Sequence, residues 1–137
     1  MKTKYSILFF FGLLIATASC DPYGGYEYWI DNKSDSTLFV IFKEKYSPTV
    51  SRIAIDKQSS RQLKKYSSID GLYDLGNNFL NNYFDSLNIY IDTLKHIRIK
   101  KDYQSRANWT YQKHSTGLLG RAGDNIYRLS ISNGDLK

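Results

Sequence analysis

Cysteine, proline and methionine are scarce in this chain of 137 residues, which contains one Cys, two Pro and one Met. A single cysteine cannot form an intrachain disulfide, and a metal site would need more ligands than it offers. Only nine glycines are present and no heptad pattern recurs, which excludes collagen and coiled-coil architectures. The chain has one long apolar run, so a multi-pass membrane protein is excluded as well.

Charge of neither sign dominates the sequence. Nineteen Lys and Arg stand against 13 Asp and Glu, for a net charge of +6, and the densest basic cluster is only Arg61, Lys64 and Lys65. Nucleic-acid-binding proteins usually concentrate their positive charge, so we expect no nucleic-acid partner. A modest basic surface favours anionic glycans, anionic lipid or an acidic protein by long-range attraction.

Aromatic residues, in contrast, are abundant. The chain contains 12 Tyr, 7 Phe and 2 Trp, with 42% apolar and 23% charged residues overall. These proportions are typical of a folded globular domain, and the aromatic bias favours β-strands. The length suits one domain with one hydrophobic core.

The N-terminus has the pattern of a secretory signal. Lys2 and Lys4 precede an apolar stretch of 12 residues, Ile7–Ala18, which is too short to span a bilayer but suits a signal-peptide core. Small residues follow at positions 17–19, directly before Cys20.

This order resembles the bacterial lipobox, in the looser form found in Bacteroidota lipoproteins, because Thr17 stands where Leu is usual. The resemblance implies that residues 1–19 are removed and that Cys20 carries palmitate-type acyl chains. A free thiol beside a plain secretory signal is the alternative. Since no acidic run follows Cys20, we expect an outer-membrane protein that faces the periplasm; exposure at the cell surface is the alternative.

The rest of the chain shows the period-two alternation of β-strands. We expect a short tether at 20–26 and one domain at 27–137. The strands are predicted at 28–31, 38–42, 52–56, 61–66, 87–91, 97–99, 109–112 and 127–132. About seven to eight short strands without an amphipathic helix predict an all-β fold, a single antiparallel β-sandwich of the Ig-like or a related kind.

Four segments carry more specific expectations. The 38–42 strand is apolar at every position and should be central and covered on both faces, while 61–66 should be an edge strand protected by lysines. The strands at 87–91 and 97–99 should form a hairpin. Residues 67–84 mix loop formers with apolar side chains, which predicts a packed crossover with one helical turn near 78–83.

The overall arrangement resembles small, mostly uncharacterised envelope lipoproteins of Bacteroidota. The segments that carry the resemblance are the signal with Cys20, residues 30–34, residues 84–92 and residues 127–132. The resemblance implies a location and a fold, and it implies no activity.

No catalytic or metal site and no cofactor is predicted. His96 and His114 occur without the spacing of a metal site or a catalytic triad, and we expect both on the surface. Asp70 and Asp74 would share a face if their segment were helical, which would suit a calcium ion or a carboxylate pair; turn formation is the alternative.

A glycine-rich stretch is the last chemical motif. Gly117, Gly120 and Gly123 beside Arg121 have a spacing that could cradle a phosphate. Phosphate loops follow a strand and open a helix, and no helix is predicted here, so we expect a long hairpin loop.

Three aromatic residues are candidates for contact with a protein partner or a glycan: Trp29, Trp109 and Tyr111. Clustered aromatic side chains at a surface bind sugar rings or proteins, although filling the core is the alternative. Trp29 alternates with Tyr28 and Ile30, which predicts that its ring is partly exposed.

Three triplets match the O-glycosylation pattern of Bacteroidota envelope proteins, an Asp followed by Ser or Thr and then a small or aliphatic residue. The acceptors would be Ser36, Ser86 and Thr93. Ser36 and Thr93 fall in predicted turns, whereas Ser86 opens a strand and should be the least accessible. Ordinary turn formation is the alternative.

The sequence therefore predicts a lipid-anchored envelope protein that binds a protein partner, as an assembly subunit, an inhibitor or an immunity factor. The alternatives are a glycan-binding lipoprotein and a hydrolase with an unrecognised site.

Overall fold

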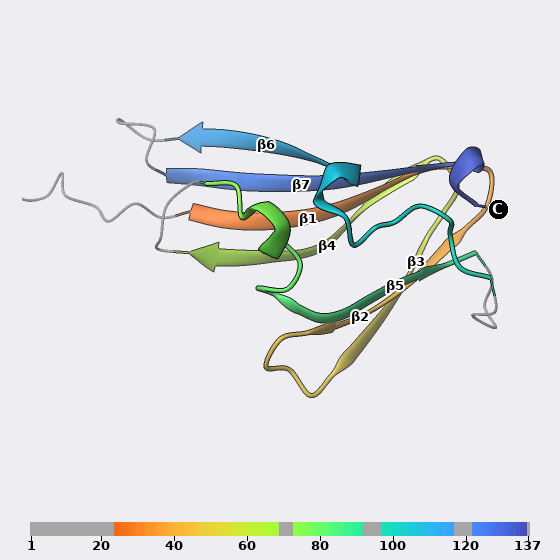
Figure 1. The fold of residues 1–137 in the computed structure, drawn as a ribbon, viewed down its shortest axis with the longest axis horizontal. Coiled ribbons are helices and arrows are strands. Elements are labelled where there is room, and N and C mark those ends of the chain that lie inside the picture. The colour runs from red at the N-terminus through yellow and green to blue at the C-terminus, as the bar shows by residue number, and fades with distance from the viewer. Residues whose placement is uncertain (1–23, 69–72, 92–96, 117–121, 137) are drawn as a thin grey trace, which may run out of the picture.

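A computed structural model of the chain describes residues 24–68, 73–91, 97–116 and 122–136. These residues form two β-sheets that pack as a sandwich (Figure 1). The strands are β1 (Gly24–Lys33), β2 (Leu38–Glu44), β3 (Val50–Ile55), β4 (Ser59–Ser68), β5 (Phe84–Tyr90), β6 (Trp109–Thr116) and β7 (Ala122–Ser132). The predicted all-β sandwich of about seven strands is confirmed.

One sheet has the order β4-β1-β7-β6 and the other has the order β3-β2-β5. All neighbours are antiparallel except β1 and β7, which pair in parallel from Gly24 beside Gly123 to Lys33 beside Ser132. The expectation of a wholly antiparallel sandwich was therefore wrong for this pair. After β1 the chain crosses to the other sheet, and the strands that later pair with β1 are β4 and the last strand, β7. Period-two alternation shows which residues face the core, but it does not show which strands are neighbours.

The alternating apolar residues fill the space between the sheets. The buried side chains of the central strands are Tyr26, Tyr28 and Ile30 in β1, Leu38, Val40 and Phe42 in β2, and Tyr127, Leu129 and Ile131 in β7. β2 is central, as predicted. Its second face is not fully covered, however, because Phe39 and Ile41 are only half-buried.

The first strand begins earlier than predicted. Gly24 and Tyr26 pair with both β4 and β7, and the Tyr26 side chain is buried in the core. Residues 24–26 are therefore not part of a tether. The sequence did not indicate a strand here because this stretch has two glycines and no apolar alternation, although it pairs with β4 on one side and β7 on the other.

The predicted hairpin at 87–99 is present only in reduced form. β5 is a regular strand, but residues 97–99 contribute a single antiparallel bridge, between Tyr90 and Arg98. Ile97 is half exposed although its alternation predicted burial beside Ile99. The turn residues at 92–94 lie outside the described residues.

The predicted packed crossover is confirmed. The segment 73–83 contains the 3₁₀-helix η1 (Gly76–Asn78), lies between the two sheets where they diverge (Figure 1), and buries Phe79 and Leu80 in the core. Two further single 3₁₀ turns are present: η2 (Arg106–Asn108) directly precedes β6, and η3 (Asn133–Asp135) directly follows β7. In the described part of the chain, no helix is long and apolar enough to cross a membrane.

Replacing Ile89 with alanine should lower the free energy of unfolding by about 2–4 kcal/mol, because its fully buried side chain contacts the core of both sheets and its removal leaves a cavity. Urea unfolding measures the effect. Val50→Ala, at a position that is half exposed, is the matched control and should cost less than about 1 kcal/mol. An unchanged urea midpoint in Ile89→Ala would contradict the placement of β5.

Candidate interaction face

The outer face of the four-stranded sheet is centred on Trp29. Its neighbours in β1, Tyr28 and Ile30, point into the core, so the Trp29 side chain points outward and is partly exposed, as predicted. Arg128 occupies the adjacent position in β7, and its guanidinium carbon lies 4.7 Å from the centroid of the Trp29 ring. This distance corresponds to a cation–π contact.

Charged side chains from three strands surround this contact and pair with one another. Trp29 Nε1 donates a hydrogen bond to Glu27 at 2.9 Å. The ion pairs join Lys65 to Glu27 at 2.9 Å, Lys65 to Asp124 at 2.8 Å, and Arg128 to Asp31 at 2.9 Å. The network links β4, β1 and β7 and fixes the orientation of Trp29. We call these residues the Trp29 face: Glu27, Trp29, Asp31, Lys65, Asp124 and Arg128.

The pairing also fixes the charges of the Trp29 face. Burial alone would raise the pKa of Glu27, but hydrogen bonds from Lys65 and Trp29 outweigh it and hold that pKa below its usual value. Hydrogen bonds to Asp124 and Glu27 raise the pKa of Lys65. Glu27 and Lys65 therefore keep their charges at neutral pH, and the pattern that they present to a partner is constant.

A hollow of about 340 Å³ lies at one end of the Trp29 face. It shares Asp31 and Arg128 with that face, and its remaining lining residues are Asn32, Lys33, Gln58, Ser59 and Ser60. Hydroxyl, carboxamide and charged groups therefore gather beside an aromatic ring, a combination that suits polar ligands.

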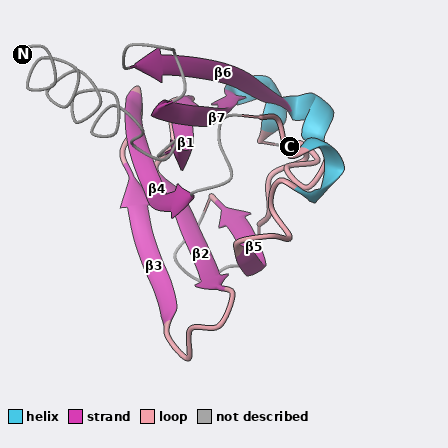
Figure 2. Ribbon diagram, turned by 90° about the vertical axis from the view of Figure 1, so that its left-hand side faces the viewer, coloured by secondary structure: helices cyan, strands magenta, loops and turns pink. Residues whose placement is uncertain are grey.

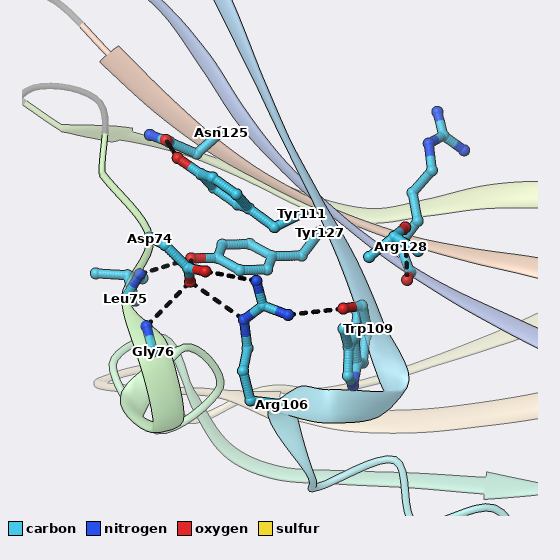
Figure 3. Close-up of polar contacts among 10 residues, drawn as sticks. Asp74, Leu75, Gly76, Arg106, Trp109, Tyr111, Asn125, Tyr127 and Arg128 are labelled. Atoms are coloured by element: carbon cyan, nitrogen blue, oxygen red, sulfur yellow. Dashed lines mark hydrogen bonds and ion pairs between the residues drawn. The ribbon is translucent and has the colours of Figure 1, made fainter.

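A second polar cluster lies on the inner side of the same sheet and is built around Asp74 (Figure 3). Arg106 donates two hydrogen bonds to the Asp74 carboxylate, from Nε at 3.1 Å and from Nη2 at 2.6 Å. The same carboxylate accepts hydrogen bonds from the Tyr127 hydroxyl at 2.9 Å and from the Gly76 amide at 3.0 Å.

Arg106 connects this cluster to β6 as well. Its Nη1 donates to the carbonyl of Trp109 at 2.6 Å, and its guanidinium lies 5.2 Å from the centroid of the Tyr127 ring. The Tyr127 hydroxyl in turn accepts a hydrogen bond from the Leu75 amide at 2.7 Å. The cluster therefore clamps the crossover to η2 and to the four-stranded sheet.

The titration behaviour of the cluster fits a clamp. Hydrogen bonds from Arg106 lower the pKa of Asp74, and burial raises the pKa of Tyr127. The carboxylate is charged and the phenol is protonated at neutral pH. The acceptor positions of Asp74 are taken by Arg106, Gly76 and Tyr127, so a calcium ion or carboxylate pair at Asp74, which a helical segment would have suited, is not supported. Asp70 lies outside the described residues.

Replacing Asp74 with asparagine should lower the free energy of unfolding by about 1 kcal/mol at pH 7, a small value because the carboxylate is 39% exposed and screened by solvent. The pKa of Asp74 is lowered in the folded protein, so its contribution is present at neutral pH and is lost as the pH falls below about 4. Urea unfolding of both proteins at pH 7 and pH 3 should show the difference shrinking in acid. Asp85→Asn, which breaks the exposed ion pair with Lys43, is the control and should cost less than about 0.5 kcal/mol.

Trp109 is not available for contact with a partner, and that prediction was wrong. Its side chain is 3% exposed, and its Nε1 donates a hydrogen bond to the carbonyl of Tyr103 at 2.7 Å. Its ring packs edge-on against Phe79 and Tyr28. The alternative interpretation, that Trp109 fills the core, is the one that the structure shows.

Tyr111 is half-buried, and its hydroxyl donates to Asn125 at 2.6 Å. Its ring lies 5.3 Å from that of Tyr127 and 5.7 Å from the Arg106 guanidinium, so it belongs to the inner clamp. Trp29 points from the opposite face of the sheet. The structure therefore does not bring the three predicted aromatic residues together.

His114 is exposed, as predicted, and lies in β6, which extends beyond the predicted strand at 109–112. Gly123 in β7 pairs with Ser115, the residue after His114, and has φ of 137°; a Cβ there would stand 1.9 Å from the His114 carbonyl oxygen. Close approach of two strands therefore explains this glycine without a phosphate. Residues 117–121, with Arg121, and His96 lie outside the described residues. Within the described residues, no group of three or more His, Cys, Asp or Glu could hold a metal ion.

The predicted modification sites differ in accessibility from what we expected. Ser36 is half-buried and its backbone belongs to a hydrogen-bonded turn, whereas Ser86 is exposed in β5 beside an irregularity of the strand. Ser86 is thus the more accessible of these two. Thr93 and Cys20 lie outside the described residues.

The sequence interpretation missed two residues that surround Trp29, namely Lys65 and Arg128. Alternation in 127–132 does place Arg128 outward. That this strand lies beside the first strand, with Arg128 next to Trp29, could not be read from either segment alone.

Comparisons of the chain with protein-family models, with curated proteins and with solved structures gave no match.

Proposed function

We propose that this chain is a lipid-anchored protein of the bacterial cell envelope, most suited to the periplasmic side of the outer membrane, that binds a protein partner through the Trp29 face. The observation that carries the proposal is the outward-pointing Trp29 ring, held by Glu27 and stacked against Arg128. Trp and Arg are the residue types that contribute most to binding energy at protein interfaces.

The rigidity of the Trp29 face supports this role. Each long side chain in it is held by an ion pair or a hydrogen bond, so a partner would immobilise few free rotamers on binding. The paired charges also give a fixed pattern of positive and negative groups, which favours one partner over others.

The short distance between Cys20 and the sandwich supports an envelope partner. β1 begins at Gly24, four residues after Cys20, and four residues span at most about 14 Å. A domain held this close to a lipid anchor reaches partners that are themselves at the membrane surface.

Replacing Trp29 with alanine should weaken capture of the partner roughly 30-fold, which corresponds to about 2 kcal/mol, a typical value for a central tryptophan. The measurement is quantitative recovery of one crosslinked protein from host envelopes with the full-length lipidated chain. Tyr46→Ala is the matched control, since Tyr46 is 92% exposed at the β2–β3 turn, away from the Trp29 face. Equal recovery with Trp29→Ala and wild type would contradict the proposal.

A second candidate function, glycan binding, is favoured by the hollow beside the Trp29 face, because the hydroxyls of Ser59 and Ser60 and the charged groups beside them suit sugar hydroxyls. A glycan array probed with the full-length chain separates the two functions. Retention of a glycan that is lost in Ser60→Ala would support the second candidate, whereas recovery of a protein partner that is insensitive to Ser60→Ala would support the first.

A further inference from the structure

β5 is the outer strand of the three-stranded sheet, with β2 between it and β3 (Figure 2). One edge of β5 pairs with β2. The other edge pairs with the chain only near its end, where the Ile91 amide donates to Ile97 at 3.0 Å and the Ile99 amide donates to Ile89 at 3.4 Å. Beyond Ile99 the backbone leaves the edge, where the Lys100 amide bonds to the Asp135 carbonyl at 2.7 Å, and the Tyr103 hydroxyl returns to it by a hydrogen bond with the Ile89 backbone.

The first half of this edge is left open at Leu87. In an antiparallel ladder, alternate residues direct both backbone polar groups to the same side. Ile89 and Ile91 direct theirs away from β2, so Leu87 does the same. Among the described residues, no hydrogen bond from the outer side reaches the backbone of Leu87. An amide and a carbonyl are therefore presented together, in the geometry of strand pairing.

A groove of about 390 Å³ runs along this open edge. Its lining residues are Asn77, Leu80, Asn81, Phe84, Asp85, Ser86, Leu87 and Gln104. The apolar members, Leu80, Phe84 and Leu87, are buried and form its floor.

The polar rim of the groove carries three exposed carboxamides, on Asn77, Asn81 and Gln104. No hydrogen bond to another described residue occupies any of these side-chain amides. The one charged lining residue, Asp85, is paired with Lys43 at 2.9 Å. The groove is therefore close to neutral and rich in groups that both donate and accept, like the peptide groups of another chain.

From this geometry we infer that the open edge of β5 accepts an extended segment of a partner protein as an added strand. The segment would pair with the Leu87 amide and carbonyl, and its flanking peptide groups would bond to the three carboxamides. Its inward side chains would be apolar, to contact Leu80 and Phe84, and its alternate side chains would be polar and uncharged. The added strand lies in line with residues 97–99, which already pair with the same edge.

This site is separate from the Trp29 face, which belongs to the other sheet. Strand addition at β5 can therefore be tested independently of the proposed function of the Trp29 face. A partner that uses both would contact the domain at two places, which raises affinity and specificity together.

The experiment measures amide hydrogen exchange of Leu87 in the full-length chain, by NMR in detergent micelles. The probe is a synthetic heptapeptide of alternating valine with serine or glutamine, at millimolar concentration. Its control is the same peptide methylated on alternate backbone nitrogens, which keeps the side chains and cannot pair as a strand. We expect the heptapeptide to slow exchange at Leu87 by roughly tenfold and the methylated peptide to leave it unchanged.

Variants locate the site. Gln104→Lys combined with Asn77→Lys should abolish the protection, because both exposed positions border the groove; Gln112→Lys, exposed in β6 on the other sheet, should retain it. Unaltered exchange at Leu87, equal protection by the methylated peptide, protection confined to β4 or β6, or protection that survives the double lysine variant would each overturn the inference. Far-UV circular dichroism checks that the variants remain folded.

Discussion

Replacing Asn32 with aspartate should lower the free energy of unfolding by about 3–5 kcal/mol at pH 7. Asn32 is 1% exposed, and its Nδ2 donates hydrogen bonds to three carbonyls, of Ser36 at 2.8 Å, Ile55 at 3.0 Å and Asp56 at 3.0 Å. An aspartate has nearly the same shape but cannot donate. It would lose all three hydrogen bonds and place a negative charge beside these carbonyls, and each lost buried hydrogen bond of this kind costs about 1–3 kcal/mol.

The effect is large because Asn32 stands where the chain changes sheets twice. β1 passes to β2 through residues 34–37, and β3 passes back to β4 through residues 56–58. The Asn32 side chain bonds to both connections, and its Oδ1 also accepts hydrogen bonds from the amide and the hydroxyl of the buried Ser34. Without these hydrogen bonds, the two connections between the sheets are no longer joined through a common side chain.

Urea unfolding followed by tryptophan fluorescence measures this difference. Asn133→Ala is the matched control, because Asn133 also makes side-chain hydrogen bonds, to Asp35, but is exposed to water. It should cost less than about 1 kcal/mol. An Asn32→Asp variant whose stability lies within about 1 kcal/mol of wild type would show that other contacts hold the corner.

Asn32 also illustrates what the sequence could predict and what it could not. The run Asn32–Ser36 is rich in turn-forming residues, and a turn was predicted there. The same letters do not show that the first of these side chains is buried and serves a second turn more than twenty residues away. That information depends on how the two sheets meet.

The same distinction holds for the candidate binding residues. Local alternation placed Trp29 outward, and the structure agrees. Trp109 was misjudged because alternation shows only that Trp109 and Tyr111 share a face of their strand; pairing opposite the buried Leu129 and Tyr127 of β7 makes that face the inner one. The open edge of β5 was hidden because a hairpin was expected to cover it, whereas residues 97–99 pair with only its end.

The aromatic excess, visible at once in the composition, has a structural explanation. Tyr28 stacks on Tyr127 with centroids 5.4 Å apart, meets Phe84 edge-on at 5.1 Å, and donates a hydrogen bond to the carbonyl of Phe79. The sheets diverge at this end, so large side chains are needed to fill the space and polar hydroxyls are needed to bond the crossover within it. Of the three aromatic residues that the sequence offered for binding, Trp109 and Tyr111 therefore contribute to packing, and Trp29 is the one on the exposed face.

Replacing Cys20 with alanine should abolish acylation completely. Under the proposed function, Cys20 supplies both the thiol that receives the lipid and the residue before which the signal is cut. Alanine has no thiol, so the variant should keep residues 1–19 and carry no acyl chains. Each buried CH₂ of an acyl chain contributes about 0.8 kcal/mol to membrane binding. The several chains of a lipoprotein anchor therefore make attachment to the membrane effectively permanent, and the variant should lose this mode of attachment.

Intact-mass analysis of the protein from its native host, together with membrane fractionation, measures this outcome. Thr17→Leu is the matched control, since it restores the residue usual at that position; it should give a mature product of unchanged mass, because residue 17 is removed with the signal. A Cys20→Ala protein that is cleaved after residue 19 and released from the membrane would indicate a plain secretory signal and a free thiol. A wild-type protein whose mass is explained by polypeptide alone would exclude the anchor, and with it the restriction of partners to the membrane surface.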